Sequence, residues 1–351
     1  MRRWLQSAAL AAAVIGLAGC ETAPPATQAP PPRFGEAFTP VDAFAQNAAM
    51  GRGVNVLGYD PLWSNPSQGR FAPGHFRLIH EAGFSNVRVV LQAFEHMDGD
   101  NRLDPKWFAT LDTMVTAALD AGLIVILDEH DFDKCSADAA ACRVKLNAFW
   151  SQVAPHFKDA SGRVLFEMLN EPHGNLTPAL WNVQLKETLA IIRASNPSRN
   201  VVIGPAFWNG LEQLANLELP DDPHIIVTFH YYHPMPFTHQ GASWVPAYTN
   251  KLGVSWGAPA EYKLITDELD MVKAWSLAHK RPIFMGEFGV YDPAALGDRV
   301  KWTSAVARAA EARGFSWAYW YFDGGFGVWD FSKPGWIAPI LNALVPPSDK
   351  K

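Results

Sequence analysis

Several features are scarce or absent in this sequence, and each absence argues against a class of protein. The 351 residues include three cysteines, with no second cysteine pair to complete a zinc site. Lys and Arg number 29 against 35 Asp and Glu, and the net charge of −6 gives no electrostatic case for nucleic acid. No glycine-rich phosphate loop follows any strand-like run, which argues against a dinucleotide-binding fold. Hydrophobic residues are abundant, at 48% of the chain, enough for a large buried core.

The first twenty residues have the pattern of an export signal. Arg2 and Arg3 precede a short apolar run, Ala8 to Leu17, and Ala18-Gly19-Cys20 follows it. This order is typical of a secretory signal peptide, and the run is too short for a transmembrane helix. Residues 17–20, LAGC, also resemble the lipobox of bacterial lipoproteins, which implies cleavage before Cys20 and lipidation of that cysteine. A plain signal peptide with an incidental cysteine is the alternative.

The residues after Cys20 are typical of a spacer. Residues 22–40, TAPPATQAPPPRFGEAFTP, are rich in proline and poor in core residues, so we expect an extended tether. We therefore divide the chain into a signal peptide at 1–19, the lipidated Cys20 with its tether at 20–45, and one folded domain at 46–348. In lipoproteins, Glu21 rather than Asp after the cysteine implies passage to the outer membrane, so we expect an exported protein anchored there.

Cys135 and Cys142 are the two remaining cysteines. Outside the reducing cytoplasm a disulfide between them is the leading interpretation, and it would tie down one local loop. A metal pair is the alternative, but the nearest histidine does not complete a zinc spacing.

From about residue 50 the chain alternates strand-like and helix-like patterns. The strand-like runs are nearly continuous in apolar and β-branched residues, as strands buried on both faces are: 53–59, 86–92, 123–130, 163–170, 200–206, 224–232, 282–289 and 315–322. Helical periods lie among them, at 73–83, 105–122, 142–158, 177–196, 208–217, 258–280 and 295–314. This alternation predicts an α/β fold, a single-domain (β/α)8 TIM barrel, with a doubly wound open sheet as the alternative.

Polar side chains gather where these strands end. In (β/α)8 barrels the active site lies at the C-terminal ends of the strands. The residues found there are Arg88, His130, Asn170, Glu171, His230, Tyr232, Glu287 and Trp320. They include two carboxylates on different strands, and glycoside cleavage requires such a pair, one to protonate the departing oxygen and one to attack the anomeric carbon or activate water. The 14 Trp and 21 Phe also suit carbohydrate, because a sugar ring has an apolar face.

Three short motifs make the assignment more specific. LNEP (169–172), HYY (230–232) and GEFG (286–289) occur in this order on the fourth, sixth and seventh predicted strands. The ordered set, from GVNVLG at residue 53 to the segment of Trp320, resembles glycoside hydrolase family 5, the clan A cellulases. The resemblance implies a retaining mechanism with no metal and no cofactor, in which Glu171 is the general acid/base and Glu287 the nucleophile.

The resemblance also implies roles for the other rim residues. Asn170 matches the residue that hydrogen-bonds the sugar 2-hydroxyl, and Trp320 the aromatic floor beneath the sugar. His130 and His230 match the histidines of the subsite at the cleavage point. Arg88 and Tyr232 match the groups that hold the nucleophile ionised and oriented.

Elementary electrostatics agrees with these roles. A carboxylate beside an arginine should have a lowered pKa, which suits Glu287. The pKa of Glu171 should be raised, partly because the charge of the other glutamate opposes its ionisation. Around His130, DEHDF (128–132) departs from the commoner family pattern, and we expect Asp128 and Glu129 to be structural.

Aromatic loops on the same face supply candidate platforms for further sugars. Trp244 and Trp329 are the main candidates, and Trp63 and Trp208 are weaker ones. Long loops on the active face are more often functional than not. A metal site can also be imagined from His224, His230, His233 and His239, but their spacing fits no usual ligand pair, and we expect none.

Taken together, these features predict a lipid-anchored retaining endo-β-glycanase, and more specifically an endo-1,4-β-glucanase acting as a monomer on a β-glycan. The nearest alternative is the same mechanism on mannan, xyloglucan, β-1,3-glucan or a glycolipid. An alternative from another class is a non-catalytic carbohydrate-binding lipoprotein, which should lack at least one of the rim residues.

Overall fold

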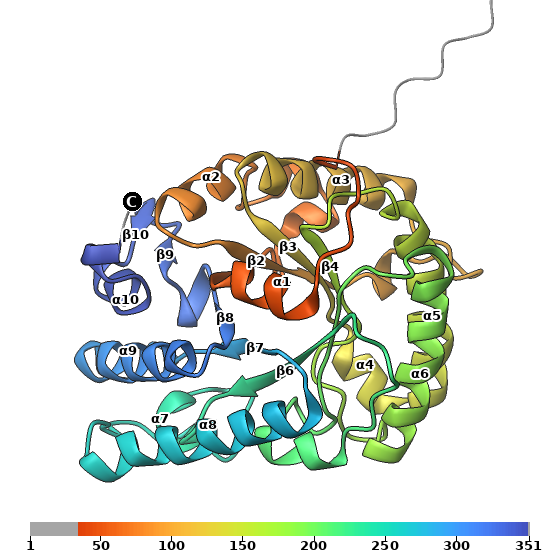
Figure 1. Cartoon of the computed structure of the whole chain (residues 1–351). Helices are drawn as coiled ribbons and strands as arrows, with labels where there is room; N and C mark the ends of the chain where they lie inside the picture. The colour runs from red at the N-terminus through yellow and green to blue at the C-terminus, as the bar shows by residue number, and fades with distance from the viewer. Residues whose placement is uncertain (1–33, 350–351) are drawn as a thin grey trace, which may run out of the picture. The chain divides into compact units, whose positions relative to one another are not determined.

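Eight parallel strands form a closed barrel in the computed structural model, which describes residues 34–349 (Figure 1). The strands follow one another in chain order, and β8 pairs with β1 to close the barrel. Their bounds are Arg52–Val56 (β1), Asn86–Leu91 (β2), Ile124–Glu129 (β3), Val164–Glu167 (β4), Val201–Ile203 (β5), Ile225–Tyr231 (β6), Ile283–Phe288 (β7) and Ser316–Tyr319 (β8). The predicted TIM barrel is therefore confirmed, and the open-sheet alternative is wrong.

Helices surround the barrel where helical periods were predicted. They are α2 (Gly74–Glu81), α3 (Pro105–Asp120), α5 (Ala139–His156), α6 (Pro178–Ser195), α8 (Pro259–His279) and α9 (Leu296–Ala312). The start of α3 is fixed by its own residues: Asp104 accepts a hydrogen bond from the N–H of Lys106, and Pro105 occupies the first turn. The predicted helix at 208–217 is instead a short 3-10 helix, η4 (Leu211–Asn216). It begins only after Gly210, because the residues before it adopt left-handed backbone angles.

A helix that was not predicted, α1 (Ala43–Met50), closes the N-terminal end of the barrel. Ala43 and Met50 join an apolar cluster with strand residues that point into the barrel, namely Ile124, Ile126, Leu165, Val202, Ile226, Phe284 and Ala318. At the start of β2, the side-chain amide of Asn86 donates to the carbonyl of Met50 over 2.9 Å. Figure 1 shows α1 in the middle of the ring of helices. The strand ends opposite α1 are left for a functional site.

The folded domain begins earlier than predicted. The tether was expected to reach residue 45, but residues 34–45 pack on the barrel. Phe34 is buried, with its ring 4.8 Å from that of Phe157, and Glu36 pairs with Arg163 over 3.0 Å. Arg199 also lies over the ring of Phe38, and the amide of Asn200 donates to the carbonyl of Val41. A segment whose composition resembles a spacer is thus docked by a few specific contacts. The predicted signal peptide, Cys20 and most of the tether lie outside the described residues.

Inside the barrel, an apolar layer gives way to a polar one two residues further along the strands. Side chains alternate between the two faces of a strand, so residues i and i+2 share a face. Ile126 in the apolar layer is thus followed by Asp128, and Leu165 by Glu167. The polar layer lies nearer the C-terminal ends of the strands, directly beneath the predicted rim residues.

Several short elements shape the loops at that end. These are α4 (Phe132–Ala137), α7 (Met235–Thr238) and the hairpin of β9 (Trp329–Asp330) and β10 (Gly335–Trp336). The C-terminal α10 (Ala338–Leu344) packs on α9. The predicted disulfide forms: Cys135 in α4 and Cys142 in α5 are joined by an S–S bond of 2.07 Å. Within residues 34–349, no helix has both the length and the apolar character needed to cross a bilayer.

Candidate active site

The predicted rim residues meet in one cleft at the C-terminal ends of the strands. The cleft has a volume of about 1030 Å³, and seven of the eight residues line it: His130, Asn170, Glu171, His230, Tyr232, Glu287 and Trp320. The eighth, Arg88, lies fully buried beneath it and contacts Glu287 and Asn170. The strand ends therefore bring together every rim residue that the sequence indicated.

Glu287, near the end of β7, is held at both carboxylate oxygens. Arg88 donates from Nη1 to Oε1 over 2.8 Å, and the hydroxyl of Tyr232 donates to Oε2 over 2.8 Å. The side chain is 6% exposed. Two donors, one of them charged, fix the orientation of the carboxylate and favour its ionised form.

The pKa of Glu287 nevertheless differs from the expectation. Burial raises it above the ordinary value, helped by the charge of Glu171, while His230 and Arg88 act in the opposite direction. Arg88 lowers the pKa of Glu287 as expected, but desolvation outweighs the guanidinium, so the net shift is upward and not downward. Arg88 also pairs with Asp128 and Glu167, so its effect on the pKa of Glu287 is smaller than that of an arginine with one partner.

Glu171 follows β4 and has a left-handed backbone, with φ of 41°. Its Oε1 lies 2.6 Å from Nδ1 of His230. Burial raises the pKa of Glu171 to about 8, against the opposing influence of Arg88 and His173. A carboxyl group with this pKa is protonated at neutral pH and can act as an acid.

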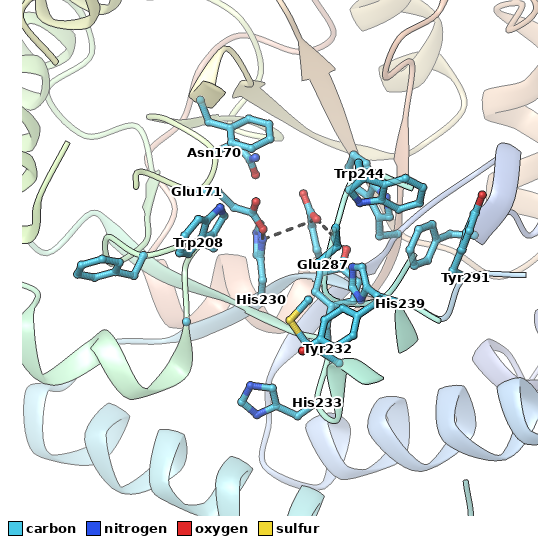
Figure 2. A pocket seen from close by; sticks show the side chains of 18 of the residues that line it. Asn170, Glu171, Trp208, His230, Tyr232, His233, His239, Trp244, Glu287 and Tyr291 are labelled. Atoms are coloured by element: carbon cyan, nitrogen blue, oxygen red, sulfur yellow. Dashed lines mark hydrogen bonds and ion pairs between the residues drawn. The ribbon is translucent and has the colours of Figure 1, made fainter. Parts of the chain in front are cut away.

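The two glutamates are close enough to act on one bond. An oxygen of Glu171, an oxygen of Glu287 and a ring nitrogen of His230 all lie within 4.8 Å of one another. Figure 2 shows the two carboxylates facing each other, with His230 and Tyr232 below them in the view. Inverting enzymes need about 6.5–9.5 Å between the carboxyl groups to admit a water, whereas retaining enzymes have about 5–5.5 Å. The spacing fits direct attack by one carboxylate.

The same three side chains are arranged closely enough to be considered as a metal site. His230 already uses Nδ1 for Glu171, and both oxygens of Glu287 accept hydrogen bonds from Arg88 and Tyr232. The atoms that would bind a metal are thus used in hydrogen bonds within the protein. The three side chains are therefore already engaged by protein partners.

Arg88 connects residues that sequence reasoning missed. Its guanidinium bonds Glu167 at two points, over 2.7 and 2.9 Å, and donates to Oδ1 of Asn55 over 2.9 Å. It also donates to Oδ1 of Asn170 over 2.8 Å, which leaves the amide nitrogen of Asn170 as the group able to bind a sugar hydroxyl. Alternation along β1 and β4 identifies Asn55 and Glu167 only once the inward face of each strand is known.

His130 is positioned by a residue that was expected to be structural. Its Nδ1 lies 2.6 Å from Oδ2 of Asp128, which also pairs with Arg88 over 3.0 Å. The imidazole stacks on Trp320, with ring centroids 5.6 Å apart and planes 5° apart. Burial and the charge of Arg88 lower the pKa of His130 to about 3, so the ring is neutral at physiological pH. With Nδ1 beside Asp128, His130 can offer its other ring nitrogen to a ligand in the cleft as a neutral hydrogen-bonding group.

Two tryptophans at the cleft are exposed and available for stacking. Trp208 is 51% exposed and lies on the side of Glu171, and Trp244 is 55% exposed and lies beyond Glu287 (Figure 2). The ring of Trp208 rests on His173, with centroids 4.5 Å apart. Tyr59 and Phe207, which the sequence analysis did not single out, line the same cleft.

Trp329 and Trp63 do not line the cleft, so these two predictions are wrong. Trp329 is 7% exposed and packs on Phe322 and Trp336, because the β9–β10 hairpin folds it into an aromatic cluster. Trp63 is buried against Trp107 and donates from Nε1 to the carbonyl of Leu57 over 2.9 Å. An aromatic residue in a loop on the active face can equally well anchor that loop.

The four histidines considered as a metal site have separate partners. His230 bonds Glu171, His233 bonds Glu268 over 2.9 Å, and Nδ1 of His239 lies 3.0 Å from the hydroxyl of Thr238. His224 precedes β6, at the opposite end of that strand from His230. The structure therefore does not bring the four together.

Comparison with known proteins places the chain in a family. The family model for cellulases of glycosyl hydrolase family 5 matches residues 45–325. Endoglucanase H of Acetivibrio thermocellus is 31% identical over 320 residues, which cover 88% of this chain and 34% of that protein. The chain thus spans about a third of the length of this curated relative.

Solved structures agree with the family match. Endoglucanase Cel5A from the hyperthermophilic Thermotoga maritima is 39% identical with a TM-score of 0.82, covering 87% of this chain and 100% of that one. The Cel5A structure in complex with mannotriose has 38% identity and the same TM-score and coverage. The cellulose synthase subunit Z of Clostridioides difficile is 34% identical with a TM-score of 0.80, covering 84% of this chain and 99% of that one.

Proposed function

The chain belongs to glycosyl hydrolase family 5, and on that premise we propose that it is a retaining endo-1,4-β-glucanase. The observation that carries the proposal is the pair of glutamates within 4.8 Å of each other in unlike surroundings. Glu287 is fixed by Arg88 and Tyr232, and Glu171 has a pKa of about 8 through burial. We assign Glu287 as the nucleophile and Glu171 as the acid/base.

In the first step, a carboxylate oxygen of Glu287 attacks the anomeric carbon and forms an ester. The bond from that carbon to the glycosidic oxygen breaks, and the departing oxygen takes the proton of Glu171. The amide of Asn170 donates to the sugar 2-hydroxyl, a contact that strengthens as the ring approaches an oxocarbenium ion.

In the second step, Glu171 acts as a base. Ester formation neutralises Glu287, so the ionised form of Glu171 no longer faces that negative charge. A water gives its proton to Glu171 and attacks the anomeric carbon, and the ester bond breaks to return Glu287 as a carboxylate. Two displacements on the same carbon retain its configuration.

Internal cleavage of a long chain fits the shape of the site. Trp208 lies on one side of the two glutamates and Trp244 on the other, and both are about half exposed. A glycan that stacks on both rings extends past the catalytic pair in each direction. This supports endo rather than exo action.

Mannan is the second candidate substrate. The support is the mannotriose complex of the similar Cel5A structure, since family membership fixes mechanism more tightly than sugar. Glucose and mannose differ at the 2-position, where Asn170 is placed to bind. A panel of carboxymethylcellulose, glucomannan, mannan, xyloglucan and β-1,3-glucan, with product lengths measured, decides both substrate and mode of attack.

The mechanism is tested by Glu287→Gln on an aryl β-cellobioside. Glutamine keeps the shape of the side chain but is a very poor nucleophile, so the expected result is a loss of at least about 10³-fold in kcat with an unchanged fold. Near-normal activity of this variant would rule out the assignment. A binding protein without catalysis is excluded if the unmodified protein hydrolyses the substrate at all.

We also propose that the enzyme is exported and held at a membrane by a lipid on Cys20. Two features of the folded domain support this. The Cys135–Cys142 disulfide suits an oxidising compartment, and Phe34 packs near the N-terminal ends of the strands, opposite the cleft. The first described residue of the domain therefore lies on the face away from the cleft. Replacement of Cys20 by Ala should move the protein from the membrane fraction to the soluble one.

A further inference from the structure

The loop after β5 has an unusual backbone at its centre. Phe207, Trp208 and Asn209 all have left-handed angles, with φ of 57°, 57° and 52°. Asparagine tolerates this region better than most residues, because its short polar side chain can hydrogen-bond locally. Three backbone hydrogen bonds hold it: the N–H of Trp208 donates to Pro172, that of Gly210 to Phe207 and that of His230 to Asn209. The loop thereby buries the side chain of Asn209 completely, beside His230.

The contact between these two side chains defines where the imidazole carries its proton. Nδ2 of Asn209 lies 3.3 Å from Nε2 of His230. With the amide in this orientation, its nitrogen is the donor and Nε2 is the nitrogen without a hydrogen, while Oδ1 of Asn209 is buried without a partner. Burial lowers the pKa of His230 to about 4, so a single ring proton remains at neutral pH. In this arrangement that proton sits on Nδ1, which the labelling experiment below tests directly.

Nδ1 of His230 faces Glu171. The separation from Oε1 is 2.6 Å, and with the proton on Nδ1 the ring is the donor and Oε1 the acceptor. When Glu171 is protonated, its proton then belongs on the other oxygen, Oε2. The opposite ring tautomer would place a bare nitrogen against Oε1 and draw the acidic proton to that oxygen, away from a substrate.

We propose that Asn209 is a positioning residue that sets the tautomer of His230 and through it directs the acidic proton of Glu171 toward the substrate. This rests on the role of Glu171 proposed above. Asn209 does not line the cleft and does not touch a substrate; its effect passes through the imidazole. The hydrogen bond to Oε1 also stabilises the carboxylate form, which opposes the effect of burial and keeps Glu171 able to act in both steps.

Other charged and titratable groups act on this pair and remain in place in the variants below. Those facing His230 or Glu171 are Tyr59 after β1, Arg88 on β2, Asp128 on β3, His130 after β3, Asp133 on α4, Glu167 on β4, His173 in the loop after β4, Tyr232 after β6 and Glu287 on β7. A substitution of Asn209 therefore alters one hydrogen bond of His230 while these surrounding groups stay the same.

Two substitutions at Asn209 should shift the pH dependence in opposite directions. Asn209→Gly removes the donor and suits the left-handed backbone, so the ring is free to adopt the other tautomer and Glu171 loses a hydrogen bond. The alkaline limb of kcat/KM should rise by about half to one pH unit, and kcat should fall by about 10-fold with KM little changed. In Asn209→Asp the carboxylate accepts a hydrogen bond from a protonated Nε2 and favours an imidazolium, so the alkaline limb should fall by about one unit.

Asn101→Gly is the matched control, because Asn101 also has a left-handed backbone, with φ of 58°, but lies outside the cleft. It should leave the limb unchanged. If both Asn209 variants keep the limb of the unmodified protein, Asn209 is only structural and the proposal is overturned.

A direct readout does not depend on activity. In protein labelled with ¹⁵N-histidine, the His230 resonances, assigned by loss in His230→Gln, should show a protonated Nδ1 and a bare Nε2 at pH 7. Asn209→Gly should weaken or reverse that preference. A protonated Nε2 in the unmodified protein overturns the inference even if the enzyme is an active glucanase. Conversely, absent hydrolysis with the expected tautomer would count against the proposed function alone.

Discussion

Glu167 and Arg88 form a two-point ion pair in the middle of the barrel, with Oε2 2.7 Å from Nε and Oε1 2.9 Å from Nη2. Both side chains are fully buried, and Glu167 does not line the cleft. The same guanidinium holds Glu287 and Asn170. Glu167 thus fixes the group that orients both the proposed nucleophile and the ligand of the sugar 2-hydroxyl.

Glu167→Gln should therefore cost both stability and turnover. Breaking a buried ion pair by changing one partner typically costs about 3–5 kcal/mol in the free energy of unfolding. Because Arg88 loses its two-point anchor, kcat should fall at least about 10-fold with a smaller change in KM. Urea unfolding and steady-state kinetics on an aryl β-cellobioside measure the two effects.

The surface pair Arg143–Glu187 is the control for this substitution. It has the same two-point geometry, with distances of 2.7 and 2.6 Å, but it is exposed. Glu187→Gln should cost at most about 1 kcal/mol and leave kcat unchanged. Equal losses of stability in the two variants would contradict the importance given to burial.

Activity should depend on pH through both glutamates. Burial raises the pKa of Glu171 to about 8, so the acid is protonated below that pH and activity falls as the pH rises through about 8. Glu287 has to be ionised to attack, and burial raises its pKa above the ordinary 4.5, so the acid limb should lie above pH 4.5. A kcat/KM profile measures both limbs. An alkaline limb near pH 5 would contradict the assignment of Glu171 as a buried acid.

Trp208→Ala should weaken substrate binding without unfolding the protein. The ring is 51% exposed at the cleft, so its removal costs little in the core but loses a stacking surface of about 1–2 kcal/mol. KM for a cello-oligosaccharide long enough to reach it should rise about 5–30-fold. The change in KM should shrink for shorter substrates; a uniform effect at all lengths would argue against a platform.

Trp329→Ala should give the opposite result. Trp329 is buried among Phe322 and Trp336, so its removal should cost about 3–5 kcal/mol in the free energy of unfolding. At temperatures where the variant is folded, KM should stay close to that of the unmodified protein. Thermal unfolding and kinetics together distinguish the two tryptophans.

The disulfide should stabilise the wall of the cleft as well as the fold. Cys135 and Cys142 are separated by 7 positions, and closing so short a loop contributes about 2–3 kcal/mol. The N–H of Asn175, in the loop after Glu171, donates to the carbonyl of Ser136 in the tied segment. The double variant Cys135→Ser/Cys142→Ser should therefore have a lower Tm and a lower kcat. A reducing agent should lower both in the unmodified protein and should not affect the variant.

The sequence was sufficient for the barrel and for the rim, for a physical reason. Parallel strands buried on both faces are continuous apolar runs, and the point at which each run stops locates the rim. Glu171, Glu287 and His230 were therefore found together with their strands. The motifs then connected them to a family.

The positions of Glu167, Asn209 and Trp329 could not be predicted from the apolar runs. Glu167 lies within the run VLFEML, and because both faces of β4 are buried, composition alone does not say which face points into the barrel. Asn209 meets His230 only through a left-handed loop. The burial of Trp329 could be predicted only if the β9–β10 hairpin were known. Each failure concerns loop conformation or the choice between two buried faces.

The most direct test of the central claim is to trap the covalent intermediate. In a 2-deoxy-2-fluoro cellobioside with an activated leaving group, the fluorine slows both displacements and the leaving group speeds only the first, so the ester should accumulate. Mass spectrometry of the intact protein should show one added fluorocellobiosyl group, and peptide mapping should place it on Glu287. An adduct on another residue, or hydrolysis of a natural substrate with inversion at the anomeric carbon, would contradict the account.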